Sequence, residues 1–158
     1  MPSPSVVRLA THADEPAIFE MCKMLHTENG MFPMDDDLVR ETMTRGIKRD
    51  NSILGVIGPE GGALEGMIFM LISNFWYSRK PHLEELFSYV PPQYRKSNHA
   101  KELIEFAKRC SNDDVRLVIG IVSNHRTETK VRLYQRRLGK PAGAFFVYPP
   151  PIAAVSHG

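Results

Sequence analysis

The sequence predicts an α/β domain of the α+β kind, in which helices cover a mixed, mostly antiparallel sheet of about six strands. Three features of the chain support this fold class. The 158 residues are 42% hydrophobic and 24% charged, as in one ordinary globular domain. Segments with strand and helix periodicity follow one another in the order β-α-α-β-β-β-α-β-α-β. Three consecutive strands in the middle indicate antiparallel hairpins, which do not fit a doubly wound parallel sheet.

The N-terminal third is predicted as a strand at residues 6–10 followed by two helices. Thr11 to Pro16 supplies a cap and acidic residues for a first helix that ends near Gly30. Its apolar face repeats at i, i+3, i+4 and i+7 through Ile18, Met21, Cys22 and Leu25. The aspartates at 35–37 predict the start of a second helix, which runs to about Arg49, because carboxylates there oppose the positive end of the helix dipole.

The rest of the chain alternates apolar runs with turn residues and further helices. Strands are expected at 52–57, 64–75, 83–90, 115–122 and 144–148. Apolar spacing after Ser97-Asn98 predicts a third helix, and a fourth is expected at 127–138. Because the third helix crosses from one strand to the next, the strands on either side of it should be parallel. The core is expected within 5–148, and 149–158 reads as a Pro-rich tail.

Charge and cysteine content narrow the class of protein. Twenty Lys and Arg against eighteen Asp and Glu give a net charge of +2, too balanced to predict a nucleic-acid or membrane partner. No apolar run approaches the roughly 18 residues of a membrane helix, and the first residues do not resemble a signal peptide. Cys22 and Cys110 fall on apolar helix faces without metal-ligand spacing. We therefore expect one cytoplasmic domain, spanning 1–158, that holds no metal.

The stretch from Val90 to Ala100 carries the strongest functional pattern. A strand ends, a proline-stiffened loop brings Arg95 and Lys96, and a helix begins near Asn98. The unpaired N–H groups and partial positive charge of a helix start suit a phosphate group, and the two basic side chains add formal charge. An ordinary capped helix with solvated basic residues has the same pattern, so the chemistry of these residues alone does not decide between the two.

The six residues Val90-Pro-Pro-Gln-Tyr-Arg95 resemble the V-x-P-x-Y-R lead-in of the GCN5-related N-acetyltransferase (GNAT) superfamily. The R/Q-x-x-G-x-G/A loop of that family then aligns with Arg95, Lys96, Ser97, Asn98, His99 and Ala100. Asn98 replaces the first glycine, and asparagine is among the residues that tolerate a positive φ. The resemblance implies a three-layer fold with helices on both faces of the sheet. It also implies an acetyl-CoA site at Tyr89, Val90 and the six loop residues.

A second similarity lies downstream, where Val131 to Gly139 resembles the L-Y-x-x-x-G-F segment of the same family. The resemblance implies that strand 115–122 splays away from strand 83–90 and leaves a wedge for the pantetheine arm of acetyl-CoA. It places Asn124 among the cofactor contacts and Tyr134 near the thioester sulfur. A partly buried helix tyrosine with its hydroxyl at the surface is the alternative reading of Tyr134.

Two glutamates before the cofactor loop are candidates for the base that removes a proton from an amine. The family often has a glutamate six residues before the loop valine, which favours Glu84 over Glu85. Strand alternation places Glu84 with Leu86 and Ser88 on one face, and Glu85 with Phe87 and Tyr89 on the other. A β-bulge, common beside active sites, would reverse this parity. A solvated carboxylate remains the alternative for each, and His82 and Ser88 are weaker candidates.

The resemblance therefore implies an N-acetyltransferase that moves an acetyl group from acetyl-CoA directly to a primary amine of a small molecule or protein. The first two helices and the turn at 75–81 should hold the acceptor, with Glu28 and 35–37 attracting the amine or serving only as helix-start charges. The aromatic run 75–77 could wall that site, form a dimer contact or join the core. A homodimer through the edge of the last strand is a further expectation. The alternative is a catalytically silent module that binds a CoA ester or a protein partner.

Overall fold

The computed structural model describes residues 6–121, 123 and 127–150, and a five-stranded sheet lies at its centre. The strands are β1 (Val7–Leu9), β2 (Ser52–Ile57), β3 (Gly66–Ser73), β4 (His82–Tyr89) and β5 (Leu117–Ile119), and they lie side by side in that order. β1 to β4 are antiparallel, whereas β4 and β5 are parallel. This arrangement confirms both the expected hairpins and the expected crossover.

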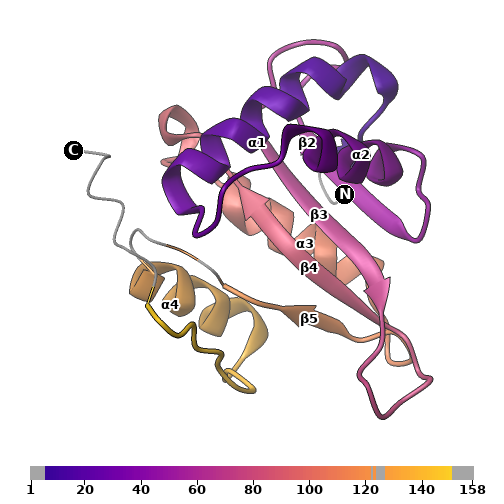
Figure 1. The fold of residues 1–158 in the computed structure, drawn as a ribbon, viewed down its shortest axis with the longest axis vertical. Helices are drawn as coiled ribbons and strands as arrows, with labels where there is room; N and C mark the ends of the chain where they lie inside the picture. The colour runs from indigo at the N-terminus through magenta and orange to yellow at the C-terminus, as the bar shows by residue number, and fades with distance from the viewer. Residues whose placement is uncertain (1–5, 122, 124–126, 151–158) are drawn as a thin grey trace, which may run out of the picture.

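The helices cover both faces of the sheet, so the fold has the three expected layers (Figure 1). They are α1 (Glu15–Asn29), α2 (Asp36–Ile47), α3 (His99–Cys110) and α4 (Thr127–Leu138), with single 3-10 turns η1 (His12–Asp14) and η2 (Pro92–Tyr94). In Figure 1, α1 and α2 lie in front of the sheet, α3 lies behind it, and α4 lies beside β5. Within the described residues, no helix combines the length and apolar character needed to cross a membrane.

A buried carboxylate fixes how the chain enters α1. The Asp14 side chain is fully buried, and Arg8 on β1 donates to its two oxygens over 2.8 and 2.9 Å. The backbone N–H groups of Thr11 and Gly61 donate to the same carboxylate. The hydrogen bonds from Arg8 outweigh burial and hold the pKa of Asp14 well below its ordinary value. One charged side chain therefore ties β1, η1 and the β2–β3 turn together.

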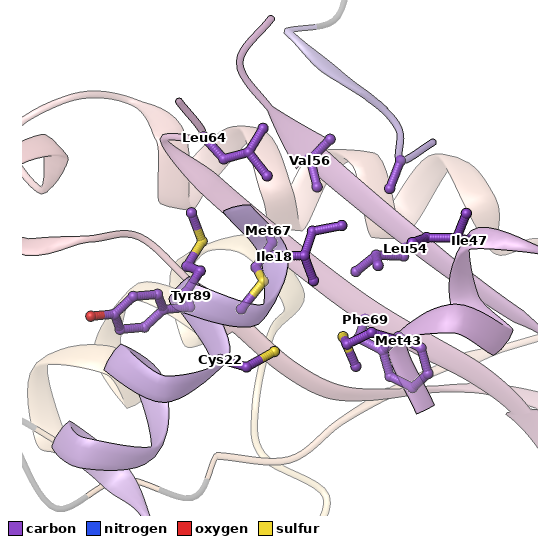
Figure 2. Close-up of a cluster of buried hydrophobic side chains, with 12 residues drawn as sticks. Ile18, Cys22, Met43, Ile47, Leu54, Val56, Leu64, Met67, Phe69 and Tyr89 are labelled. Atoms are coloured by element: carbon purple, nitrogen blue, oxygen red, sulfur yellow. The ribbon is translucent and has the colours of Figure 1, made fainter. Parts of the chain in front are cut away.

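Two hydrophobic clusters fill the spaces between the layers. The cluster in Figure 2 lies between α1, α2 and the sheet and includes Ile18, Met43, Leu54 and Phe69. The second cluster lies between α3 and the opposite face of the sheet, and it includes Leu103. Both clusters draw on β3, whose successive residues point to opposite faces of the sheet. Burial of apolar area in these two clusters is the main source of stability for such a fold.

The approach of α2 to the sheet depends on a glycine. A Cβ atom at Gly46 would lie 2.8 Å from the Phe69 ring and 3.1 Å from Cβ of Leu54. Real Cβ atoms essentially never come as close to another atom as the first of these distances. Glycine is unfavourable inside a helix by about 1 kcal/mol relative to alanine, so close packing is the reason that this residue suits the position.

The predicted last strand is wrong, because residues 144–148 form no strand in the structure. Phe146 and Tyr148 are 92% and 93% exposed, so these side chains enter neither cluster. Prolines at 141 and 149 flank the segment, and a proline has no N–H to donate to a neighbouring strand. An apolar run becomes a strand only where it finds a partner, and β5 is only three residues long. The edge on which the expected homodimer was based is therefore absent.

Candidate active site

β4 and β5 separate partway along their length and form the expected wedge. Their paired residues run from Leu83↔Leu117 to Glu85↔Ile119. β5 then ends, whereas β4 continues to Tyr89. The strands therefore diverge on the side where the loop to α3 begins, and this confirms the splayed arrangement that the family resemblance implied.

α4 runs across this wedge from the α1 side to the α3 side. Near its N-terminus, Lys130 donates to Ser123 Oγ over 2.8 Å, and Ser123 in turn donates to Asn29 at the end of α1. Near its C-terminus, Lys108 of α3 donates to the backbone oxygen of Arg137. The middle of α4, which carries Tyr134, therefore lies at the mouth of the wedge.

A β-bulge interrupts β4 beside the wedge. Phe69 of β3 pairs with Phe87, but its neighbour Met70 pairs with Glu85, so Leu86 is one residue extra. Such an extra residue stays outside the ladder of hydrogen bonds and bends the strand. Leu86 is accordingly 45% exposed although it lies in a central strand.

The bulge reverses the parity expected from simple alternation. Cross-strand partners share a face of the sheet, so Glu84 lies with Phe87 and Tyr89 on the face covered by α1 and α2. Glu85 lies with Ser88 on the α3 side. The predicted grouping of Glu84 with Ser88, and of Glu85 with Phe87, was therefore wrong, because one inserted residue moves each later side chain to the opposite face.

Glu84 is the accessible member of the glutamate pair. Its side chain is 38% exposed, and its Oε1 lies 3.4 Å from Nε2 of His82. His82 is buried beneath Phe75, whose ring stacks on the imidazole with centroids 4.8 Å apart. A carboxylate that is half open to solvent and adjacent to an imidazole can accept a proton directly or through water.

Glu85 differs from its neighbour in almost every respect. It is 4% exposed, and its Oε2 atom is buried without a hydrogen-bond partner among the residues that the structure describes. Burial raises the pKa of Glu85 to about 8, because a charge is poorly solvated there. At neutral pH the side chain therefore carries a proton.

Tyr134 lies beside Glu85 at the wedge. Its hydroxyl is 2.8 Å from Ser88 Oγ, an interaction that joins α4 to β4. Burial raises the pKa of Tyr134 well above its ordinary value, and a negative charge on Glu85 would raise it further. The phenol therefore keeps its proton. Its hydroxyl faces the wedge rather than the surface, in contrast to the alternative reading of this residue.

Arg95 takes part in an ion pair that sequence reasoning missed. Its Nη2 donates to Glu28 Oε2 of α1 over 2.6 Å, and its Nε donates to the backbone oxygen of Val90. Tyr89 also donates to Glu28 Oε2, over 3.2 Å. Burial alone would raise the pKa of Glu28, but Arg95, Tyr89 and Lys130 together outweigh it and lower that pKa. Burial and the Glu28 charge raise the pKa of Tyr89 to about 12.

The start of α3 is open to solvent. Lys96, Ser97, Asn98 and Ala100 are exposed, whereas His99 is held by a contact of 2.8 Å to Glu65. Ser97 Oγ accepts a hydrogen bond from the backbone N–H of His99. Asn98 has a φ of −87°, so the turn forms without the positive φ that a glycine would allow. The first N–H groups of a helix find no partners within the helix, and at His99 the Ser97 hydroxyl supplies one. Asn124 lies outside the described residues.

A cavity of about 440 Å³ opens between α1, α2 and β4. The bulge residues Leu86 and Phe87 form one wall. Its other walls come from α1, α2 and the loop between them, namely Cys22, Leu25, His26, Asn29, Gly30, Pro33, Met34, Asp35, Leu38, Val39, Thr42 and Met43. The first two helices thus form a pocket beside the wedge.

The aromatic run after β3 does not line this cavity. Phe75, Trp76 and Tyr77 are 50%, 94% and 70% exposed, so the core reading of these residues was wrong. Within the described part of the chain, no three His, Cys, Asp or Glu side chains lie close enough together to hold a metal ion.

Comparison with known proteins places this geometry in a recognised fold. No family model and no curated protein matches the sequence. Among solved structures, a possible acetyltransferase from Clostridium difficile 630 matches with a TM-score of 0.69 and 13% identity, over 90% of this chain and 95% of that one. AAC(6')-Iy, in complex with the bisubstrate analogue CoA-S-monomethyl-acetylneamine, matches with the same TM-score and coverage and 16% identity. A ribosomal-protein-alanine N-acetyltransferase from Brucella melitensis biovar Abortus 2308 matches with a TM-score of 0.65 and 15% identity, over 89% and 95% of the two chains.

These identities are low, and the likeness is one of fold. The chain has the fold of the GNAT acetyltransferases, as the motifs around Arg95 and Tyr134 indicated. The described sheet has five strands rather than about six, because residues 144–148 do not join it.

Proposed function

We propose that this protein transfers an acetyl group from acetyl-CoA to a primary amine without a covalent enzyme intermediate. The observation that carries the proposal is the wedge between β4 and β5, which has the bulge and Tyr134 at its mouth. The open start of α3 lies on one side of it and the cavity on the other. One structural neighbour is in complex with a bisubstrate analogue containing CoA, which supports the choice of donor.

The cofactor would be held by chain elements that offer positive charge and open N–H groups. The pantetheine arm would lie in the wedge, along Tyr89 and Val90. The pyrophosphate would lie at the start of α3, where the helix dipole and the first-turn amides favour an anion. Lys96 is exposed there, and Arg95 lies one residue before it. Asn124 remains a proposed contact on the basis of the family motif.

In the proposed reaction, the amine nitrogen attacks the thioester carbonyl carbon, and the carbon–sulfur bond breaks. A protonated amine has no lone pair, so Glu84 takes a proton from it directly or through water. The Leu86 N–H, which lies outside the ladder as the extra residue of the bulge, would polarise the carbonyl oxygen. The departing thiolate would take a proton from the Tyr134 hydroxyl, which keeps its proton until then. The second proton that the nitrogen loses as the amide forms would return to the Tyr134 oxygen, directly or through water, and Glu84 would release its proton to solvent. The products are the amide and CoA with a thiol.

A catalytically silent module that binds a CoA ester is the second candidate. Departures from the family motifs favour it, because Asn98 stands where the first loop glycine is usual and Lys140 stands where an aromatic residue commonly follows the glycine. The two candidates make the same prediction for binding and opposite predictions for turnover.

A thermal-shift assay with acetyl-CoA and CoA tests the cofactor binding that both candidate functions require. Ligand that binds only the folded state raises Tm, and the absence of any shift at millimolar ligand would exclude both candidates. Lys96→Glu should reduce the shift strongly, because it puts a negative charge at the proposed pyrophosphate position. Lys48→Glu is the matched control, with the same charge change on an exposed residue beyond the end of α2.

Thiol release over a panel of amines then separates the enzyme from the silent module. Glu84→Gln and Tyr134→Phe should lower kcat while leaving the thermal shift intact. Unchanged rates in both variants would reject these two assignments. Binding of acetyl-CoA without thiol release for any amine would favour the silent module.

A further inference from the structure

The walls of the cavity beside the bulge are mostly apolar. Its lining includes the apolar side chains of Leu25, Val39, Met43 and Phe87. Leu38 on α2 and Leu86 on the bulge are 59% and 45% exposed. A concave apolar surface of about this volume is the usual form of a small-molecule site.

The polar side chains of the lining are engaged with the chain itself. His26 Nε2 lies 2.6 Å from the backbone oxygen of Phe32, and Thr42 Oγ1 donates to the backbone oxygen of Leu38 over 2.8 Å. Asn29 Oδ1 accepts from Ser123. These contacts hold the polar groups to the walls, so the apolar carbons dominate the surface that a ligand meets.

The negative charge available at the cavity is small. Asp35 is the one Asp or Glu among its lining residues, and its Oδ1 accepts the backbone N–H of Leu38 as the cap of α2. Glu28, at the end of α1, is paired with Arg95. A ligand with several ammonium groups needs several carboxylates to offset the loss of hydration, because each unpaired buried charge is costly. The described walls suit one positive charge at most.

We propose that the acceptor is a small primary amine whose single ammonium group is attached to an apolar chain or ring. The apolar body occupies the cavity, and the amine points past Leu86 toward the wedge. This inference rests on the proposed function. The proposed acceptor differs from the ligand of one structural neighbour, an aminoglycoside acetyltransferase in complex with sisomicin, since aminoglycosides carry several amines on a polar scaffold.

Steady-state acetylation of 2-phenylethylamine, hexylamine, neamine and a short peptide with an N-terminal alanine tests the proposal. We expect kcat/KM for the two apolar amines to exceed that for neamine and for the peptide by about a hundredfold. Leu38→Asn should raise KM for 2-phenylethylamine about tenfold with kcat unchanged, because it removes an apolar contact remote from the reacting atoms. Leu138→Asn, at another exposed leucine, is the matched control and should change neither value. Equal or better use of neamine or of the peptide would overturn the inference and leave the proposed function standing.

Ligand-observed NMR with 2-phenylethylamine and with neamine, without cofactor, gives a readout independent of turnover. We expect signals for 2-phenylethylamine that disappear in Leu38→Asn but persist in Leu138→Asn. That result without thiol release would support the apolar preference while refuting the enzymatic role. Binding of neamine in preference to 2-phenylethylamine would overturn the inference whatever the turnover.

Discussion

Replacing Glu85 by glutamine should stabilise the protein at neutral pH and leave it unchanged near pH 4. An unfolded chain exposes this carboxyl to water, where its pKa is about 4.5, whereas the folded protein raises that pKa to about 8. Between these values the folded state holds a proton that the unfolded state has lost. Unfolding therefore releases a proton, and the stability of the native protein falls as the pH rises from 4.5 to 8.

The size of the effect follows from the gap between the two pKa values. Each pH unit above 4.5 costs about 1.4 kcal/mol, so the penalty at pH 7 is about 3 kcal/mol. The glutamine side chain has nearly the same shape and no proton to lose. Glu85→Gln should thus gain about 3 kcal/mol at pH 7, and this gain should shrink to nothing as the pH approaches 4.

Urea unfolding of both proteins at several pH values between 4 and 8 measures this difference directly. Other titrating groups are common to both proteins and cancel in the comparison. Glu84→Gln is the matched control, because it makes the same chemical change one residue earlier in the strand, at a side chain that is partly exposed. A Glu85→Gln difference that stays flat across this range would refute the buried, protonated state of Glu85.

Three further predictions concern other residues. Asp14→Asn should cost about 3 kcal/mol in urea unfolding at pH 7, because Arg8 loses its buried partner; since the folded pKa of Asp14 is depressed, this cost should fade as the pH drops below 3.8. Gly46→Ala should lower the free energy of unfolding by about 1–2 kcal/mol, because the added Cβ meets the Phe69 ring. Gly143→Ala should be neutral, since a Cβ there meets nothing within 4 Å, and equal Tm values for the two variants would contradict this prediction. Tyr134→Phe should lower kcat for amine acetylation about a hundredfold with CoA affinity unchanged, as measured by thiol release and calorimetry, and an equal loss of CoA affinity would argue for a structural role instead.

Most helices and inner strands could be predicted because local signals coincide with tertiary contacts. The second helix starts at the aspartates 35–37 as predicted, and β2 matches its predicted bounds. The crossover through α3 required parallel strands, and they are parallel. The strand predicted at 144–148 does not form, because an apolar run becomes a strand only when the edge of a sheet is available for it to pair with.

The candidate site was harder to predict, because its geometry depends on a β-bulge and on contacts between residues far apart in the chain. One extra residue at Leu86 decides which glutamate is buried, and no local pattern in Leu83 to Val90 marks a bulge. The contact of Ser88 with Tyr134 joins residues 46 positions apart. The pairing of Arg95 with Glu28 spans 67 positions, and a sequence shows only that both charges exist.

The Arg95–Glu28 pair has a consequence for any phosphate group that approaches the cofactor loop. Because Glu28 already neutralises the guanidinium, a phosphate bound there replaces one anion with another instead of filling a bare cationic site. The displaced carboxylate belongs to α1, whose last two turns wall the cavity. Arrival of the anion would therefore release that helix from the loop. Binding of the anion at the cofactor loop would thus be coupled to the position of the helix that walls the cavity, because the phosphate replaces Glu28 as the partner of Arg95.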